Sequence, residues 1–222
     1  MNKLSATNIS MNFTNAQDSL NVLQEISLEL SEGQSIGIIG SSGCGKTTLL
    51  QILAGLETPS SGSVYFNETN LSENKKTKFA QLRPSLFGFV YQFHYLLEDL
   101  TLFENCELSF QILKSKDHLA NHASIMAIFE ELGIAHLKDS YPFTLSGGER
   151  QRAAIARAVA HKPTFLLMDE PTGNLDNDTS NNVFEYFMKY TKENNCAVIM
   201  ATHNLELASM AGKRIEIGNK NE

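Results

Sequence analysis

Hydrophobic positions in the first part of the chain follow the spacing of strands and then of a helix. A rough two-residue alternation is typical of a strand with one buried face, and it is formed by Leu23, Ile26, Leu28 and Leu30. Residues 35–39 are almost continuously apolar, as in a strand buried on both faces. Glycines follow, and residues 47–53 then have the composition of a helix. A turn at 59–62 leads into a short strand at 63–66.

The middle of the chain changes to helical spacing, from about residue 94 to residue 145. One helical face, at i, i+3, i+4 and i+7, is formed by Ile125, Ile128, Phe129 and Leu132. Gly133 comes directly after this face and is expected to end the helix.

Strands and helices alternate again in the last third of the chain. The pattern predicts a helix at 149–160, a strand at 165–168, a helix at 181–190 and a strand at 197–200. Strands that alternate with helices favour a mainly parallel sheet covered by helices. We therefore expect a single α/β domain over residues 1–222, with a helical lobe inserted at approximately 93–145.

Charge and composition narrow the choice of partners. The 222 residues carry a formal net charge of -7, which disfavours nucleic acid as a ligand. The cluster Lys75, Lys76 and Lys78 lies beside Glu73 and is expected to be a solvated loop rather than a basic binding patch.

The cysteines and the apolar runs bear on the compartment. Cys44, Cys106 and Cys196 are too far apart to form a zinc or redox motif, and an odd, sparse count fits a reducing compartment. No signal peptide and no run of about 18 apolar residues is present. We therefore expect a cytoplasmic chain, for which any membrane role comes through a partner.

Residues 40–47 match the phosphate-binding pattern G-x-x-x-x-G-K-[ST] between a buried strand and a helix. Backbone N–H groups of such a loop point at phosphate oxygens, Lys46 would reach the β- and γ-phosphates, and the Thr47 hydroxyl would bind Mg²⁺. The alternative is a glycine-rich turn without a ligand. The residues expected to bind ATP are Gly40, Ser41, Ser42, Gly43, Cys44, Gly45, Lys46, Thr47 and Thr48.

Polar residues follow two of the later predicted strands. Asp169 and Glu170 end the strand at 165–168, where ligands of open α/β sheets bind. Asp169 would hold Mg²⁺, and Glu170 would point toward an attacking water as a general base. A turn or cap role is the alternative for this acidic pair. His203 follows the strand at 197–200 and would bond the γ-phosphate, although a lone histidine can also be an ordinary loop residue.

The segment 145–151, Leu-Ser-Gly-Gly-Glu-Arg-Gln, precedes a predicted helix. Ser146 with Glu149 three residues later forms a capping box. Gly147 and Gly148 also leave the helix N-terminus open to an anion, so this segment has two compatible readings.

This segment resembles the signature motif of ABC-type ATPases, and the resemblance extends over essentially the whole chain. It implies a P-loop NTPase fold: a RecA-like, mainly parallel core sheet, an N-terminal antiparallel β subdomain and an inserted α-helical subdomain. It also implies a head-to-tail dimer of two copies with two ATP molecules at the interface. In that dimer Ser146, Gly147 and Gly148 of one copy would bind in trans the ATP held by the other.

Further positions acquire roles through the same resemblance. Phe13 matches the aromatic residue that stacks on adenine, with a core phenylalanine as the alternative. Gln92 matches the glutamine that senses Mg²⁺ and the attacking water, Asp176 matches the loop that links the two sites, and His203 matches the switch histidine. Asn204 departs from the pattern, because aspartate usually follows that histidine.

Within the family, residues 88–97 and 169–176 are similar to the ATP-binding subunits of bacterial lipoprotein-releasing systems. The resemblance implies integral membrane subunits as partners, docked on the helical lobe, and a place at the cytoplasmic face of the inner membrane. The lipid substrate would contact those subunits and not this chain.

Macrolide-export and cell-division ATPases share much of the pattern and are the alternative. ABC proteins of DNA repair or translation need coiled coils or a second cassette, and a non-hydrolysing module would lack Glu170 or His203.

Overall fold

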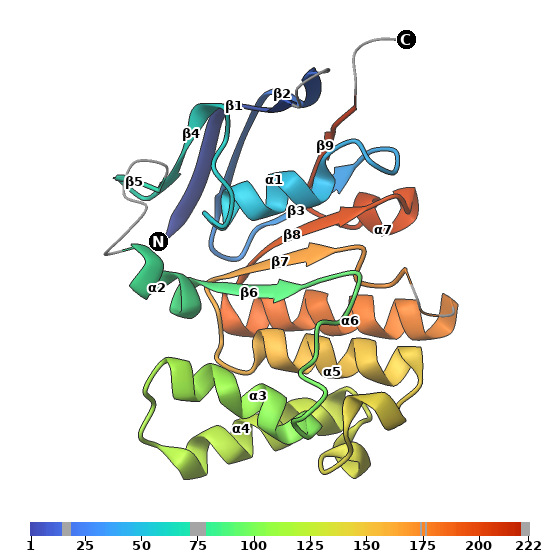
Figure 1. The fold of residues 1–222 in the computed structure, drawn as a ribbon. Helices are drawn as coiled ribbons and strands as arrows, with labels where there is room; N and C mark the ends of the chain where they lie inside the picture. Colours follow the sequence, from blue (N-terminus) through green and yellow to red (C-terminus); the bar gives the residue numbers. More distant parts are fainter. Residues whose placement is uncertain (15–18, 72–78, 174, 176, 219–222) are drawn as a thin grey trace. The chain divides into compact units, whose positions relative to one another are not determined.

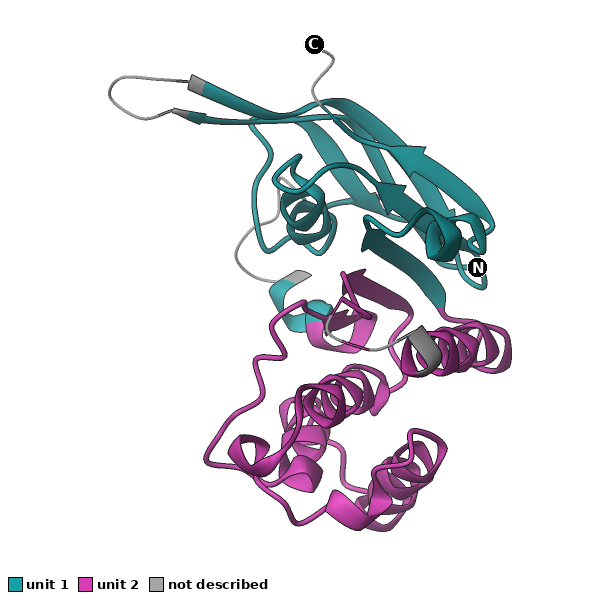
Figure 2. Ribbon diagram, turned by 90° about the vertical axis from the view of Figure 1, so that its right-hand side faces the viewer, with its two compact units in different colours: residues 1–83, 197–222 teal, residues 84–196 magenta. Residues whose placement is uncertain are grey.

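The computed structural model describes residues 1–14, 19–71, 79–173, 175 and 177–218. The chain forms two compact units, and each is described by itself (Figures 1 and 2). Unit 1 is made of residues 1–83 and 197–222, and unit 2 of residues 84–196.

Unit 1 contains an antiparallel sheet with the strand order β2-β1-β4-β5. Its strands are β1 (Lys3–Thr14), β2 (Ser19–Ser31), β4 (Ser61–Phe66) and β5 (Thr69–Asn70). The two long strands pair from Lys3 opposite Ser31 to Thr14 opposite Ser19. Alternate residues of β1, including Leu4 and Ala6, are buried, which gives this sheet one core face. The expected N-terminal antiparallel subdomain is thus confirmed.

Unit 1 also contains parallel strands. β3 (Ser35–Ile39) lies between β8 (Ala197–Thr202) and β9 (Lys213–Glu216), with Ile39 opposite both Thr202 and Glu216. The predicted strands at 35–39 and 197–200 are correct, and both are buried because neighbours cover both faces. Two helices belong to this part, α1 (Lys46–Leu53) and the short α7 (Leu205–Ser209).

Unit 2 contains the parallel pair β6 (Phe87–Val90) and β7 (Phe165–Asp169), with Val90 opposite Met168. Its helices are α3 (Leu102–Ile112), α4 (His118–Glu131), α5 (Gly147–Val159) and α6 (Asn177–Asn194). Two single-turn 3₁₀ helices, η1 (Ala135–Leu137) and η2 (Pro142–Thr144), lie between α4 and α5. The helix α2 (Phe79–Leu86) contains the point at which the chain passes from unit 1 to unit 2.

The helices of the middle block confirm the predicted pattern. Ile125 and Phe129 are buried on α4, and the helix ends just before Gly133, which has a φ of 66°. α3 packs against both α4 and α5, which gives the helical region its own core. Across the described parts of the chain, no helix is long and apolar enough to cross a membrane.

Candidate nucleotide-binding site

The phosphate-binding loop connects β3 to α1 in unit 1, as predicted. Gly45 precedes α1 with a φ of 97°, a conformation that residues with a side chain rarely adopt. At the other end of the loop, a Cβ on Gly40 would lie 2.3 Å from Cys44 Sγ and 2.3 Å from the Ile217 carbonyl oxygen. Both glycines are therefore required by the local packing.

Lys46 is the buried cation of this loop, with only 7% of its surface exposed. Its Nζ donates hydrogen bonds to the carbonyl oxygens of Gly40 at 2.8 Å and Ser41 at 3.1 Å. The ammonium group is thus held against the loop backbone, while Ser41, Ser42 and Thr47 remain exposed. A glycine-rich loop that holds a cation at the start of a helix suits a polyphosphate.

His203 leaves the sheet at the same end as the loop. It follows Thr202, which lies opposite Ile39, the residue before Gly40. Asn204, the unusual residue after it, begins α7: its Oδ1 accepts hydrogen bonds from the N–H groups of Glu206 at 2.9 Å and Leu207 at 3.2 Å. An amide oxygen therefore performs the capping that a carboxylate would perform here.

Gln92, Asp169 and Glu170 lie in unit 2, whereas Phe13 belongs to β1 of unit 1. Gln92 comes two residues after β6 and Asp169 ends β7, so the register brings both to the same edge of this strand pair. The Asp169 carboxyl is buried. Glu170 has a φ of 47°, so the strand geometry ends there and the side-chain alternation with Asp169 is broken.

Mg²⁺ is bound by hard oxygen donors, commonly one or two carboxylates together with phosphates of the substrate. The expected protein donors Thr47, Gln92 and Asp169 have this chemistry. In the portion of the chain that the structure describes, no group of three or more His, Cys, Asp or Glu residues is arranged to hold a metal without a substrate.

The segment 145–151 forms the capping box that its sequence predicts. Ser146 Oγ accepts a hydrogen bond from Glu149 N–H at 3.3 Å, and Glu149 Oε2 accepts from Ser146 N–H at 2.8 Å. Ser146 Oγ also donates to Glu149 Oε2 at 2.7 Å. This bond and the one from Ser146 N–H lower the pKa of the Glu149 carboxyl. The cap reading of Ser146 is therefore correct.

No contact within the described chain explains why residue 147 is a glycine. A Cβ at this position would meet no atom of the described chain within 4 Å, and Gly147 is the first residue of α5. Glycine is a poor helix residue, so its presence here is not explained by the fold of a single chain.

Three other sequence predictions have different outcomes. Phe13 is 46% exposed, so the alternative of a core phenylalanine is wrong. Asp176 lies outside the described residues, as do Lys75, Lys76 and Lys78.

Two residues of α5 to which the sequence assigned no role contact segments that contain predicted site residues: Gln151, the last residue of the segment 145–151, and Arg157. Gln151 is buried and donates a hydrogen bond from Nε2 to the Pro171 carbonyl at 2.7 Å, just after Glu170. Arg157 donates to the carbonyls of His94 and Tyr95, shortly after Gln92. One sequence feature could have indicated the role of Gln151: it is a polar residue on the same buried face of the helix as Ile155 and Ala158.

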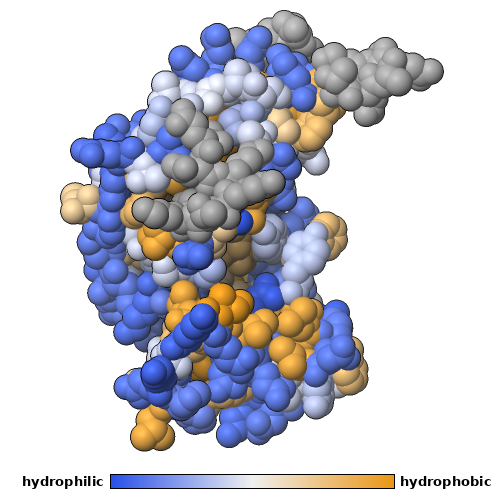
Figure 3. Space-filling view, turned by 60° about the vertical axis from the view of Figure 1, so that its left-hand side comes forward, coloured by the Kyte–Doolittle hydropathy of each residue, from blue (hydrophilic) through white to orange (hydrophobic). Residues whose placement is uncertain are grey.

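Arg157 thereby holds in place a segment with large exposed apolar side chains. Phe93 is 68% exposed and Tyr95 is 64% exposed. The Tyr95 ring contacts Tyr91 edge-on, which in turn stacks on Phe89 of β6. Figure 3 shows further hydrophobic side chains gathered over the lower, helical part of the molecule. We call Phe93, Tyr95 and Leu97 the exposed apolar segment.

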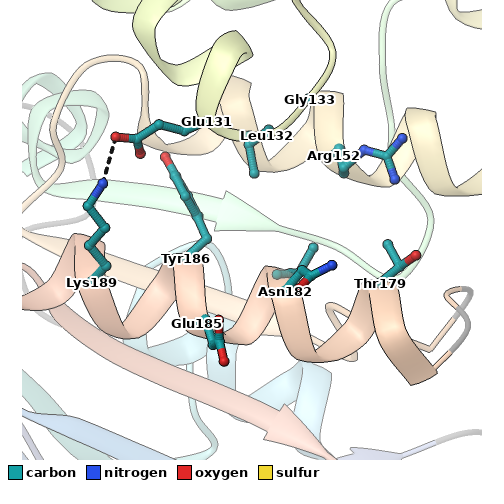
Figure 4. A pocket seen from close by; sticks show the side chains of 10 residues that line it. Glu131, Leu132, Gly133, Arg152, Thr179, Asn182, Glu185, Tyr186 and Lys189 are labelled. Carbon is teal, nitrogen blue, oxygen red and sulfur yellow. Dashed lines mark hydrogen bonds and ion pairs between the residues drawn. The ribbon is translucent and has the colours of Figure 1, made fainter.

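A cavity of about 720 Å³ lies elsewhere in unit 2, beside α6 (Figure 4). Leu132, Arg152, Val183 and Tyr186 line it, and the Lys189–Glu131 ion pair, at 2.9 Å, lies at one side. The Tyr186 hydroxyl is buried there without a hydrogen-bond partner in the described structure. None of the predicted site residues lines this cavity.

Comparison with known proteins agrees with this geometry. Residues 23–173 match the model of a protein family described as "ABC transporter". Two similar solved structures are "Dimeric Structure of MJ0796, a Bacterial ABC Transporter Cassette" and "Dimeric structure of a post-hydrolysis state of the ATP-binding cassette MJ0796 bound to ADP and Pi". Each has 28% sequence identity and a TM-score of 0.90, and each match covers 97% of this chain and 94% of the MJ0796 chain. The chain belongs to the ABC transporter family and is an ATP-hydrolysing subunit of such a transporter.

Proposed function

We propose that two copies of this chain bind ATP between them, with the phosphate-binding loop of one copy facing Ser146, Gly147 and Gly148 of the other. The observation that supports this most directly is the open space at Gly147. Because nothing in its own chain excludes a side chain there, the glycine serves something that approaches from outside. A phosphate on the N-terminus of α5 fits, since the helix dipole and free N–H groups favour an anion. The MJ0796 cassette forms a dimer.

In this site each residue has one role. Lys46 binds the β- and γ-phosphates, Phe13 stacks on adenine, and His203 bonds the γ-phosphate. Glu170 is the general base that polarises the attacking water. Mg²⁺, held by Thr47, Gln92 and Asp169, would neutralise charge on the phosphates when bound.

Closure of the dimer would act on integral membrane subunits through the lobe at approximately 93–145. The exposed apolar segment supports this, because exposed aromatic side chains held on a fixed backbone are typical of protein–protein contacts. Its occupant would be a cytoplasmic helix of a membrane subunit, at the cytoplasmic face of the inner membrane.

The transporter that we propose is the lipoprotein-releasing system, in which membrane subunits move lipoproteins from the bacterial inner membrane to a periplasmic carrier. Its support is the similarity of residues 88–97 and 169–176, which include the exposed Phe93 and the half-buried His94. A macrolide-export or cell-division complex is the second candidate. Co-purification with the native membrane subunits distinguishes them.

Gly147→Asp tests the shared ATP site. An aspartate in the first turn of a helix is favourable for an isolated chain, so the melting temperature should be unchanged or higher. The same carboxylate would repel a phosphate of the other copy, so ATP-dependent dimerisation and hydrolysis should be lost.

The matched control is His118→Asp, which also introduces an aspartate at the first residue of a helix, α4, where the side chain is exposed. It should leave dimerisation and hydrolysis unchanged. Normal ATP-dependent dimers of the Gly147→Asp chain, measured by light scattering, would refute the shared site.

A further inference from the structure

Gln151 makes a buried polar contact between α5 and the end of β7. It is 1% exposed, and its Nε2 donates to the Pro171 carbonyl at 2.7 Å. A buried amide with one bond to a neighbouring element fixes that element, because breaking the bond leaves a buried polar group without a partner.

The Pro171 carbonyl directly follows Glu170, and Glu170 has the unusual backbone. A φ of 47° is unfavourable for a residue with a side chain, and it persists only where the surroundings hold it. Gly173 N–H donates to the Glu170 carbonyl at 3.1 Å, and Gln151 holds the next carbonyl along the chain. These two hydrogen bonds fix the backbone from which the Glu170 carboxylate projects.

We propose that Gln151, through its hydrogen bond to the Pro171 carbonyl, is a positioning residue for Glu170. The proposal rests on the proposed function, because it takes Glu170 as the base.

The first experiment compares Gln151→Leu and Gln151→Met with the unchanged full chain. We expect kcat for ATP hydrolysis to fall by about 10- to 100-fold, since small misplacements of a reacting group have effects of this size. The Kd for a fluorescent ATP analogue should change by less than about twofold, because the phosphate-binding loop is untouched. Methionine keeps the length of glutamine, so it preserves packing if leucine does not.

The control is Tyr190→Phe, which removes another buried side-chain-to-backbone hydrogen bond of unit 2, from Tyr190 Oη to the Val159 carbonyl at 3.2 Å. It should leave kcat within about twofold. Equal kcat in the Gln151 variants and this control would overturn the inference.

A double-mutant cycle separates positioning from a general structural effect. In a Glu170→Gln background, Gln151→Leu should cause no further loss of residual hydrolysis, because residues that act as a unit are not additive. A further tenfold loss would contradict a role through Glu170. Near-normal turnover of Glu170→Gln alone would instead refute the proposed base.

Discussion

Single residues fit tightly together at the start of the phosphate-binding loop. The space that a side chain on Gly40 would need is filled by Cys44 Sγ and by the Ile217 carbonyl. Cys44 is half-buried, whereas burial raises the pKa of Cys106 and of Cys196 to about 12 each. Because the thiolate is the reactive form, these two thiols are protected in the native chain.

We therefore expect one fast-reacting thiol out of three when the native protein is treated with iodoacetamide and analysed by mass spectrometry. It should be Cys44, and ATP at ten times its Kd should slow the reaction about tenfold by covering the loop. A Cys44→Ser chain should show no fast phase. Equal labelling of all three cysteines, or no effect of ATP, would contradict this account.

The sequence assigned roles to the loop at 40–47 and to Ser146 but none to Gln151, because the contact of Gln151 is with a residue distant in the chain. The loop at 40–47 and the capping box at Ser146 are formed by neighbours in the chain, so their spacing predicts their geometry. The Gln151–Pro171 bond joins residues 20 positions apart on different elements. Only the placement of a glutamine on a buried helix face hinted at it.

At the scale of elements, α6 contains two buried tyrosines one turn apart, and the hydroxyl groups of these tyrosines differ in their hydrogen bonding. Tyr190 donates to the Val159 carbonyl of α5, whereas the Tyr186 hydroxyl, at the cavity of Figure 4, is buried without a partner among the described atoms. A buried hydroxyl without a hydrogen bond is unfavourable, whereas a hydrogen-bonded one is favourable. The two hydroxyl groups should therefore contribute to the free energy of unfolding with opposite signs.

Tyr186→Phe is therefore expected to raise the free energy of unfolding by about 1 kcal/mol, and Tyr190→Phe to lower it by about as much. Urea unfolding followed by circular dichroism measures both. The two variants share a helix and lose the same atom, so each is the control of the other. Equal destabilisation by both would show that the Tyr186 hydroxyl is satisfied in solution.

Strongly apolar elements were predicted well, whereas several short or polar ones were missed. β3 and β7 have continuous apolar runs because neighbours cover both faces. β9 is mostly exposed, and its sequence Lys-Arg-Ile-Glu has no such run. α2 contains Pro84, which usually breaks a helix, and β6 has only four residues. Their formation depends on tertiary contacts that spacing does not reveal.

At the scale of the whole molecule, the proposed cycle predicts what happens when hydrolysis stops. Glu170→Gln keeps the size of the side chain and removes the base, so hydrolysis should fall at least about 100-fold while ATP still binds. Dimers that form with ATP would then persist and elute as such in size-exclusion chromatography. With ADP the same chain should elute as a monomer, and Lys46→Ala should remain monomeric throughout. Near-normal turnover of Glu170→Gln would exclude it as the base.

The position of β3 has a consequence for how the protein is made. This strand carries the phosphate-binding loop, yet its two neighbours, β8 and β9, come from residues 197–202 and 213–216. During synthesis the ribosome must therefore add more than 150 residues after Ile39 before the strand can be enclosed. Because the chain emerges from its N-terminus, Lys46 leaves the ribosome long before the strands that pair with β3 have been synthesised. A nascent chain cut short before β8 would carry the entire loop sequence and bind no nucleotide.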